Sequence, residues 1–253
     1  MELIDKHTAV IILAAGLGKR MKSDKAKVLQ KILNKPMVVY VIETAKKVAR
    51  DDVIVVIGNQ AEKVRKIVSE SQEVVFALQK SQLGTGHAVI CALPHIPDHI
   101  GQVIILCGDV PVLTAGTVNR LLNDHKKAKR DITLLATEID NPKGYGRIVF
   151  DKKGCVVGIV EEVDATEEQK KIKTINTGIY CVKKDFLFDS LKKIGPDNLQ
   201  KEFYLTDIVG VAHEERKNIG VVTGTDFEEF MGVNDPRDLV EIENIMRRRL
   251  TYL

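Results

Sequence analysis

The chain has 253 residues, of which 44% are hydrophobic and 29% are charged, which is typical of a globular protein with a sizeable core. Its 38 basic and 35 acidic residues give a net charge of +3, and the basic residues are spread along the chain. A nucleic-acid-binding protein needs a clustered basic face, so we predict no nucleic-acid partner. No window approaches the roughly 20 consecutive apolar residues that span a bilayer, so we also predict no membrane partner.

The cysteines and the N-terminus predict a cytoplasmic location. The cysteines are well separated, form no C-x-x-C pair and are typical of buried, reduced thiols. The segment that begins at Met1 contains acidic residues and no apolar stretch, so we expect no secretory signal peptide.

Apolar, strand-like segments alternate with helical patterns through the first half of the chain. This alternation predicts an α/β fold: a Rossmann-like, mostly parallel sheet with helices on both faces. Ligands of such sheets bind beyond the carboxyl ends of the strands. The predicted strands are 9–13, 53–57, 74–78, 103–106 and 132–136, and the predicted helices are 37–49, 61–69, 87–93 and 115–129.

The pattern changes after about residue 143. Segments 144–150 and 155–160 flank a turn and predict a β-hairpin, and 175–182 predicts another strand. We interpret them as a small antiparallel β lobe built onto the main sheet, in which Glu161 and Asn176 end strands. The later predicted elements are a helical excursion at 165–171, helices at 184–193, 203–215 and 235–250, and a strand at 219–222.

The most informative motif follows the first strand and reads Leu13-Ala-Ala-Gly-Leu-Gly-Lys-Arg-Met21. Small residues let the backbone approach a ligand closely, and Arg20 and Lys27 add positive charge, so the motif favours a phosphate-rich ligand. Met21 stands where the dinucleotide fingerprint needs a third glycine, and Arg20 stands where the P-loop needs Ser or Thr. A tight strand-to-helix turn with no ligand is the alternative interpretation.

Two oxygen-bearing side chains are candidate metal ligands. Asp109 follows a buried strand and Gly108, where a carboxylate can hold a hard cation, although it could instead N-cap a loop or helix. Asn234 precedes the last predicted helix, and from its position alone an N-cap is the favoured role. The D-x-D motif of many glycosyltransferases is absent at Asp109.

A second glycine-rich loop, Gln82-Leu-Gly-Thr-Gly-His-Ala88, also follows a strand. Its glycines bracket Thr85 and suit a backbone that hydrogen-bonds a planar ligand edge. Gln79 carries an amide that can donate and accept, as a nucleobase edge requires. A ligand-free entry into a helix is an equal alternative. In the lobe, Glu161 and Asn176 are natural partners for sugar hydroxyls.

Together and in this order, these segments resemble the uridylyltransferase (pyrophosphorylase) domain of the bacterial N-acetylglucosamine-1-phosphate uridyltransferases. The motif at Leu13–Met21 marks only the wider sugar nucleotidyltransferase superfamily. The second glycine-rich loop, combined with Gly144-Tyr-Gly-Arg147 and Ile175-Asn-Thr-Gly178, is much more specific. The resemblance covers essentially all 253 residues.

The resemblance implies magnesium-dependent transfer of UMP from UTP to N-acetylglucosamine 1-phosphate, giving UDP-N-acetylglucosamine, a peptidoglycan precursor, and pyrophosphate. It implies Mg²⁺ as the cofactor and UTP and a sugar 1-phosphate as substrates. It implies that Arg20, Lys27 and Asp109 are catalytic, and that Asp109 and Asn234 bind the metal. The other implied residues are Leu13, Ala14, Ala15, Gly16, Gln79, Gly84 and Thr85 for the nucleotide, and Gly146, Glu161 and Asn176 for the sugar.

The resemblance also implies a domain organisation. Residues 1–253 form one nucleotidyltransferase domain, with a nucleotide-binding half (1–143), a sugar-binding lobe that returns to the sheet (144–231) and a C-terminal helix (232–253). We expect no β-helix acetyltransferase domain, and we make no prediction of oligomeric state, because the family's trimer is built on that β-helix.

Two alternatives stay open. Cys107 and Val163 depart from the family pattern, in which a bulkier residue and a lysine are common. The first alternative is therefore that the chain is another sugar-1-phosphate nucleotidyltransferase, which uses glucose 1-phosphate with UTP or dTTP. The second alternative is a non-catalytic, nucleotide-binding regulatory subunit, which would be expected to lose the basic edge or the metal carboxylate.

Overall fold

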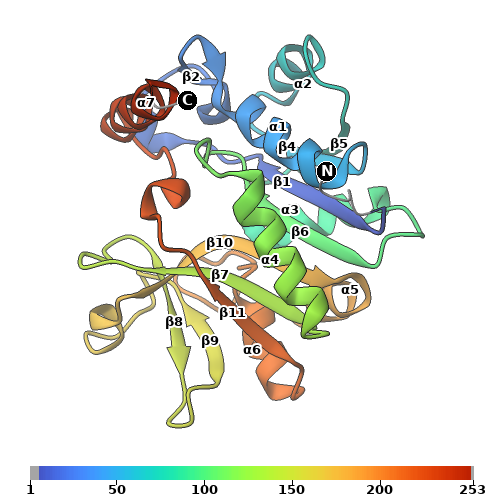
Figure 1. Cartoon of the computed structure of the whole chain (residues 1–253), viewed down its shortest axis with the longest axis vertical. Coiled ribbons are helices and arrows are strands. Elements are labelled where there is room, and N and C mark those ends of the chain that lie inside the picture. The colour runs from blue at the N-terminus through green and yellow to red at the C-terminus, as the bar shows by residue number, and fades with distance from the viewer. Residues whose placement is uncertain (1–5, 252–253) are drawn as a thin grey trace.

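The computed structural model describes residues 6–251, and most of the N-terminal segment considered for a signal peptide lies outside them. A nine-stranded sheet runs through the molecule (Figure 1). Its first half is parallel, as predicted: β1 pairs with β4 and β6, and β4 pairs with β5. These strands are β1 (Thr8–Ala14), β4 (Val53–Ile57), β5 (Val75–Leu78) and β6 (Gln102–Cys107).

The second half of the sheet contains an antiparallel strand that the sequence did not predict at this place. β10 (Thr174–Lys183) lies between β6 and β7 (Ile132–Glu138) and is antiparallel to both. β11 (Ile219–Thr223) then pairs parallel with β7 and forms that edge of the sheet. The fold is therefore a mixed, mostly parallel α/β sheet.

The predicted hairpin is present as β8 (Gly146–Phe150) and β9 (Val156–Val160). As predicted, it forms a small antiparallel lobe built onto the main sheet, although most of β10 belongs to the central sheet. Only the start of β10 pairs with β8, with Asn176 opposite Gly146. Asn176 therefore lies within a long strand and does not end one, which corrects the prediction.

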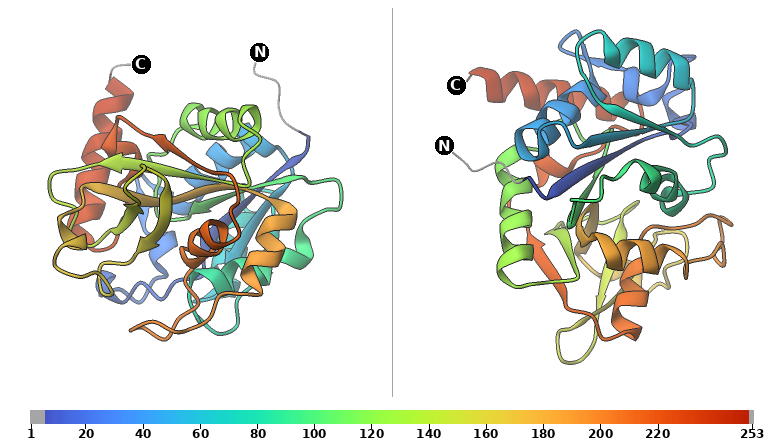
Figure 2. Two further views of the ribbon diagram at one scale, coloured as in Figure 1. Left: turned by 90° about the horizontal axis from the view of Figure 1, so that it is seen from below. Right: turned by 90° about the vertical axis from the view of Figure 1, so that its right-hand side faces the viewer.

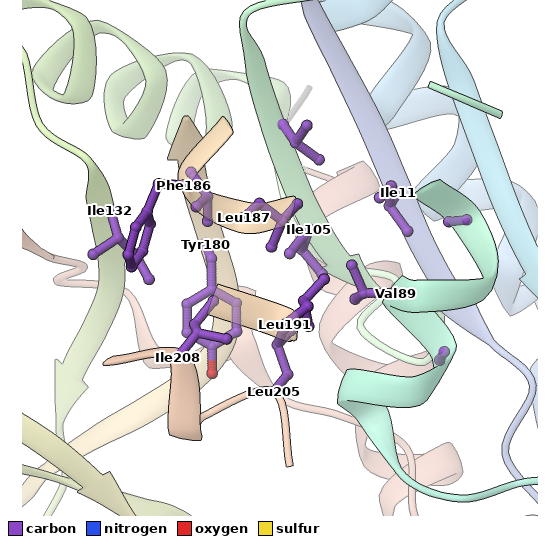
Figure 3. Close-up of a cluster of buried hydrophobic side chains, with 14 of the residues drawn as sticks. Ile11, Val89, Ile105, Ile132, Tyr180, Phe186, Leu187, Leu191, Leu205 and Ile208 are labelled. Carbon is purple, nitrogen blue, oxygen red and sulfur yellow. The ribbon is translucent and has the colours of Figure 1, made fainter. Parts of the chain in front are cut away.

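Helices cover both faces of the sheet, because alternate strand residues point to opposite sides. Ile11 of β1 belongs to the core under α3 (Thr85–Ala92), α5 (Lys184–Leu191) and α6 (Asp207–Glu214). Figure 3 shows this cluster, with Tyr180 and Leu187 in it. Ile12 belongs to the opposite core, under α1 (Met37–Ala49), α2 (Ala61–Ser69) and α4 (Ala115–Lys127). Figure 2 shows α4, in green, on the side of the sheet away from the orange helices α5 and α6.

Two predicted helices are shorter than expected. The excursion at 165–171 contains only the 3-10 helix η4 (Gln169–Lys171), and α6 begins at Asp207, four residues later than predicted. Residues 203–206 are instead held in a loop against the second glycine-rich loop. The remaining elements are η1 (Lys19–Met21), η2 (Lys27–Leu29), β2 (Lys31–Ile32), β3 (Lys35–Pro36), η3 (Leu93–His95), η5 (Phe227–Phe230) and α7 (Pro236–Thr251).

The C-terminal helix α7 packs back onto the N-terminal half. Ile242 and Ile245 of α7 are buried in a third cluster with Ile32 and Met37. This packing brings Asn234, just before α7, toward the first glycine-rich loop. Among residues 6–251, no helix has the length and apolar character needed to cross a bilayer. The cysteines are free thiols. Cys181 is buried as predicted, but Cys91 and Cys107 are half-buried and Cys155 is exposed, so the prediction that all are buried is wrong.

Candidate active site

A pocket of about 540 Å³ lies at the carboxyl ends of β1, β5 and β6. This is the edge where ligands bind in open α/β sheets. The sequence correctly predicted that distant segments meet here, although the roles of the residues stay predictions. The predicted nucleotide, catalytic and metal residues that line the pocket are Leu13, Ala14, Ala15, Gly16, Gln79, Gly84, Thr85, Arg20, Lys27, Asp109 and Asn234.

The first glycine-rich loop is shaped by Gly18. Its φ is 60°, a left-handed value that favours glycine, and a Cβ there would stand 2.7 Å from the Cβ of Lys27. Gly18 thus allows the loop to close over the start of η2, which projects Lys27 into the pocket. A Cβ at Gly16, in contrast, would have no atom within 4 Å and would point into open space.

Two cations meet the two candidate metal ligands. Lys27 Nζ forms a half-buried ion pair with the carboxylate of Asp109. Arg20 Nη2 donates a hydrogen bond of 2.8 Å to Asn234 Oδ1. The backbone joins the two pairs, because Val233 N donates to Asp109 O at 2.9 Å. Residues separated by more than 200 positions therefore form one charged cluster at the pocket.

Neither candidate metal ligand is a helix cap. Asp235 caps α7, since its Oδ1 accepts hydrogen bonds from the backbone N–H groups of Arg237 (2.7 Å) and Asp238 (3.2 Å). α4, the next helix after Asp109, is capped by Thr114. The alternative N-cap interpretations of Asp109 and Asn234 are both wrong, because their side chains line the pocket and contact Lys27 and Arg20.

The oxygen atoms of Asp109 and Asn234 suit a divalent cation. A Cβ built at Gly232 would lie 3.8 Å from Asp109 Oδ2 and 3.8 Å from Asn234 Nδ2, so both side chains border the same small space. Carboxylate and amide oxygens are hard ligands, and Mg²⁺ binds with one or two carboxylates while keeping waters and substrate phosphates. Residues 6–251 contain no cluster of three or more His, Cys, Asp or Glu that could hold a metal ion.

At the opposite end of the pocket, the second glycine-rich loop is clamped to the α5–α6 connection. Phe203 N donates to Leu83 O, and Gly86 N donates to Phe203 O, both at 2.8 Å. Gly84 has φ 109°, and a Cβ there would stand 2.5 Å from Phe203 O. Thr85 Oγ1 accepts from Leu205 N at 2.9 Å. Close packing against Phe203 therefore requires glycine at Gly84 and Gly86. The alternative of a ligand-free entry into a helix thus explains part of this motif.

The three predicted sugar-site residues lie together, outside the lining of the pocket. Glu161 Oε2 is 3.3 Å from the position of a Cβ at Gly146, and Gly146 pairs with Asn176 across β8 and β10. Asn176 Nδ2 donates to Tyr180 Oη at 2.7 Å, and Glu161 Oε1 accepts from Thr206 at 3.1 Å. Burial raises the pKa of Glu161, although Thr206 opposes this, and the charges of Asp207 and Asp164 raise it further.

Cys107 joins the sugar cluster to the pocket. It lines the pocket, and its Sγ donates a weak hydrogen bond of 3.6 Å to Gly178 O, two residues after Asn176. Burial raises the pKa of this thiol to about 12, and the carboxylate of Asp109 adds to the shift. The thiol is therefore neutral and unsuited to act as a nucleophile.

The sequence reasoning did not name eight further lining residues, of which four carry a polar group or a thiol. Gln82 and Lys19 lie inside motifs that were recognised, so their sequence signal was present. Cys107 was noticed only as a departure from the family pattern. Glu202 directly precedes the helix predicted at 203–215, and no local pattern marks it as a pocket residue. These four residues are Lys19, Gln82, Cys107 and Glu202, and the other missed residues are Leu17, Gly18, Val28 and Ala88.

Comparison with protein families matches residues 9–240 to the nucleotidyl transferase model. The chain belongs to the nucleotidyl transferase family. Members of this family generally use a divalent metal, which agrees with the oxygen ligands at the pocket.

Within the nucleotidyl transferase family, the chain is similar to bifunctional GlmU proteins. It is 43% identical over 245 residues to the one from Pelobacter propionicus (97% of this chain, 53% of that protein). It is 47% identical over 240 residues to the one from Caldanaerobacter subterraneus (95% of this chain, 52% of that protein). The chain thus spans about half the length of these relatives. It also shares its fold with a provisionally assigned glucose-1-phosphate thymidylyltransferase of Bacillus anthracis (TM-score 0.72, 17% identity, 95% of each chain covered).

Proposed function

We propose that this chain transfers UMP from UTP to N-acetylglucosamine 1-phosphate, releasing pyrophosphate and forming UDP-N-acetylglucosamine. One observation supports this most strongly: the Lys27–Asp109 and Arg20–Asn234 pairs line a pocket that also contains Gln79. One cavity thus contains positive charge that suits a triphosphate and a side-chain amide that suits a nucleobase. The identity of 43–47% to GlmU proteins over nearly the whole chain supports the same substrates.

The transfer of UMP depends more on the positioning of the substrates and on positive charge than on a general base. The attacking atom is a phosphate oxygen that is already largely ionised at neutral pH, because its second pKa is about 6. The main barrier is therefore the approach of two polyanions. Arg20 and Lys27 would lower it by holding the triphosphate with fixed positive charge. Mg²⁺ held by Asp109 and Asn234 would neutralise charge on the phosphate oxygens. The neutral thiol of Cys107 gives no reason to invoke a covalent intermediate.

For the sugar, the proposal uses Gly146, Glu161 and Asn176. Their clustering gives a carboxylate and an amide beside a glycine without a side chain, which suits hydroxyl and acetamido groups. The free thiols support a cytoplasmic setting, which is part of the same proposal.

The test is a pyrophosphate-release assay over a panel of nucleotides and sugar 1-phosphates. We expect the fastest turnover with UTP and N-acetylglucosamine 1-phosphate. A preference for glucose 1-phosphate, or for dTTP, would assign a different sugar nucleotidyltransferase. No release with any pair, but binding of UTP, would favour the regulatory-subunit alternative.

The assay has a matched set of variants. Asp109→Asn and Lys27→Ala each remove a charge from the cluster at the phosphates, and we expect each to lower kcat by about 10²–10³-fold, the usual loss for one electrostatic contributor. Glu70→Gln removes a carboxylate at an exposed position and is the control. Near-normal turnover of Asp109→Asn would contradict the proposed site.

A further inference from the structure

Thr206 stands at the N-cap position of α6, yet its hydroxyl does not cap this helix. Threonine is favoured at N-caps because its hydroxyl accepts a hydrogen bond from an N–H group of the first turn. Here the N–H groups of Asp207, Ile208 and Val209 donate instead to backbone carbonyls three residues earlier, at 3.1–3.3 Å. A threonine whose hydroxyl has another partner departs from the local rule, and such departures are expected at functional sites.

The partner of the Thr206 hydroxyl is the carboxylate of Glu161. The hydroxyl donates to Oε1 at 3.1 Å, and Thr206 is only 5% exposed. Within residues 6–251, no other group donates a hydrogen bond to this carboxylate. Oε2 is therefore left for a ligand. It lies 3.3 Å from where a Cβ at Gly146 would stand, so the missing side chain at Gly146 keeps this oxygen uncovered.

Thr206 is held in place by contacts outside the sugar cluster. Leu205 N donates to Thr85 Oγ1 at 2.9 Å, and Phe203 forms two backbone hydrogen bonds of 2.8 Å with the second glycine-rich loop. The short side chain of Thr206 thus presents its hydroxyl at a fixed point, whereas the longer side chain of Glu161 has more rotamer freedom to lose. This geometry makes Thr206 the fixed partner and Glu161 the oriented one.

The surroundings of Glu161 oppose its ionised form. Burial raises its pKa, the hydrogen bond from Thr206 lowers it, and the charges of Asp207 and Asp164 raise it again. Asp207 is the first residue of α6, and Asp164 lies in the turn after β9. Burial, followed by the charge of Asp164, raises the pKa of Asp207 to about 6. At neutral pH, Glu161 therefore has two anionic neighbours.

The other titratable groups that face Glu161 are neutral at pH 7. They come from three further parts of the chain, and burial is the main cause that raises the pKa of each. The hydroxyl of Thr206 is therefore the group that favours the charged form of Glu161 against the two anions. These neutral groups are Cys107 of β6, Tyr180 of β10 and Tyr204 of the α5–α6 connection.

We propose that Thr206 is a positioning residue for the sugar 1-phosphate: its hydroxyl fixes Oε1 of the Glu161 carboxylate and so leaves Oε2 as an acceptor for hydroxyl groups of the sugar. This deepens the proposed function and rests on it. The protonation state matters because an ionised carboxylate only accepts hydrogen bonds, whereas a protonated one carries a donor. Thr206 acts through Glu161 in both respects, by orienting the carboxylate and by favouring its charge.

The test is the pH dependence of kcat/KM for N-acetylglucosamine 1-phosphate at saturating UTP. Thr206→Val is nearly isosteric and removes the donor, so the pKa of Glu161 should rise. We expect the acid limb to move to higher pH by about one unit, roughly the effect of one hydrogen bond to a charged group. KM for the sugar phosphate should rise about tenfold near pH 7, and KM for UTP should not change. Thr206→Ser keeps the donor and should restore most of the wild-type profile.

Two further variants separate this effect from a loss of stability. Asp207→Asn removes a neighbouring anion, so the acid limb should move to lower pH, opposite to Thr206→Val. Thr44→Val is the matched control, because it also removes a buried hydroxyl, which donates to Leu113 O at 2.9 Å from α1 on the other face of the sheet. It should leave the profile unchanged. The phosphate of the substrate titrates in the same range for every variant, so the difference between variants is the readout.

A second measurement needs no turnover. The ¹³C carboxyl resonance of Glu161, assigned by its loss in Glu161→Gln, reports the pKa of this side chain directly. We expect a higher value in Thr206→Val and a lower value in Asp207→Asn than in the wild type. Thr206→Ala removes the same donor with a smaller side chain, so the result does not depend on the folding of one variant.

Each outcome decides something. An unchanged acid limb or an unchanged pKa of Glu161 without the donor, or equal rises in the KM of both substrates, would overturn the proposal. Failure of Thr206→Ser to restore the profile would also overturn it. If the wild-type protein turned over no sugar 1-phosphate, the proposed function would fail, and this inference would fail with it. If the wild type is active but neither the acid limb nor the pKa moves, only this inference fails.

Discussion

Two glycines in the first loop have different physical roles although they are two positions apart. Gly18 is held at φ 60° and in close approach to Lys27. Gly16 has open space where a Cβ would be and lines the pocket. The sequence showed only that both are glycines after a strand. Which one the fold requires and which one the ligand requires depends on contacts with η2 that no local pattern contains.

This difference predicts opposite effects of the same substitution. Gly18→Ala should lower the free energy of unfolding by at least about 1 kcal/mol, because alanine is strained at positive φ and its methyl group meets Lys27. Gly16→Ala should leave the thermal midpoint nearly unchanged and weaken UTP binding, because its methyl group enters the pocket. Thermal unfolding and calorimetric titration check the pair. Equal effects of both changes on stability would contradict this division of roles.

At the residue scale, the sequence predicted which residues form the charged cluster better than it predicted their hydrogen bonds. Asp109 and Asn234 were recognised, but an N-cap was favoured for Asn234. In the structure Asp235 caps α7, whereas the side chain of Asn234 accepts a hydrogen bond from Arg20.

At the scale of elements, Arg147 holds the β8–β9 hairpin to its surroundings. Its side chain is 1% exposed and pairs with Glu162 at 2.7 Å. The guanidinium also donates to Tyr145 O and, at 3.4 Å, to Lys170 O. One buried cation thus joins β8, the end of β9 and η4, which together carry Gly146 and Glu161.

We therefore expect Arg147→Met to disturb the sugar end of the site selectively. It removes the partner of the partly exposed Glu162 carboxylate, so we expect a cost below the roughly 3 kcal/mol of a fully buried pair. KM for the sugar 1-phosphate should rise several-fold while KM for UTP changes little. Lys171→Ala is the control, because its pair with Glu168 is exposed and contributes little. A rise in the KM of UTP alone would show that the hairpin does not serve the sugar.

His125 ties α4 to the sheet and predicts how stability depends on pH. The ring is buried, with Nδ1 2.8 Å from Thr133 Oγ1 and Nε2 2.8 Å from Gln102 Oε1. Burial, followed by the charges of Lys183 and Arg130, lowers the pKa of His125 to about 4. The folded state therefore binds this proton less tightly than the unfolded state does.

The direction of the effect follows from linkage. The stability that the neutral ring contributes is complete above pH ~6.5, the ordinary value, and is lost as the pH falls toward 4. Between pH 8 and pH 5 the loss should reach about 2 kcal/mol. Urea unfolding of the wild type and of His125→Gln at several pH values measures it. A variant with the same pH dependence as the wild type would contradict this assignment.

Most helices and strands were predicted from the sequence because each has a local pattern. The helices at Met37–Ala49 and Ala61–Ser69 match their predicted bounds. β10 was recognised as a strand, but its place between β6 and β7 was not, because pairing across more than 70 residues leaves no local trace. The start of α6 was wrong, since the contacts of Phe203 with Gly84 and Gly86 override a helical pattern.

At the scale of the whole molecule, the site depends on segments from both ends of the chain. The first loop supplies Arg20 and Lys27, the middle supplies Asp109, and the segment before α7 supplies Asn234. α7 is anchored to the N-terminal half through Ile242 and Ile245. Binding of a metal–triphosphate complex to this cluster should therefore stabilise contacts across the whole nucleotide-binding half.

This predicts a thermal shift that needs both UTP and the metal. A ligand at about 100 times its dissociation constant stabilises the folded state by about 2.7 kcal/mol, which corresponds to roughly 5–10 °C for a chain of this size. We expect such a rise in Tm with Mg²⁺ and UTP. We expect most of it to be lost when EDTA removes the metal, because Asp109 and Asn234 would then face the triphosphate without a bridging cation. Asp109→Asn should show the smaller, metal-independent shift in both conditions. An equal shift with Mg²⁺ and with EDTA in the wild type would mean that the nucleotide is held by Arg20 and Lys27 alone, and the metal site proposed here would be wrong.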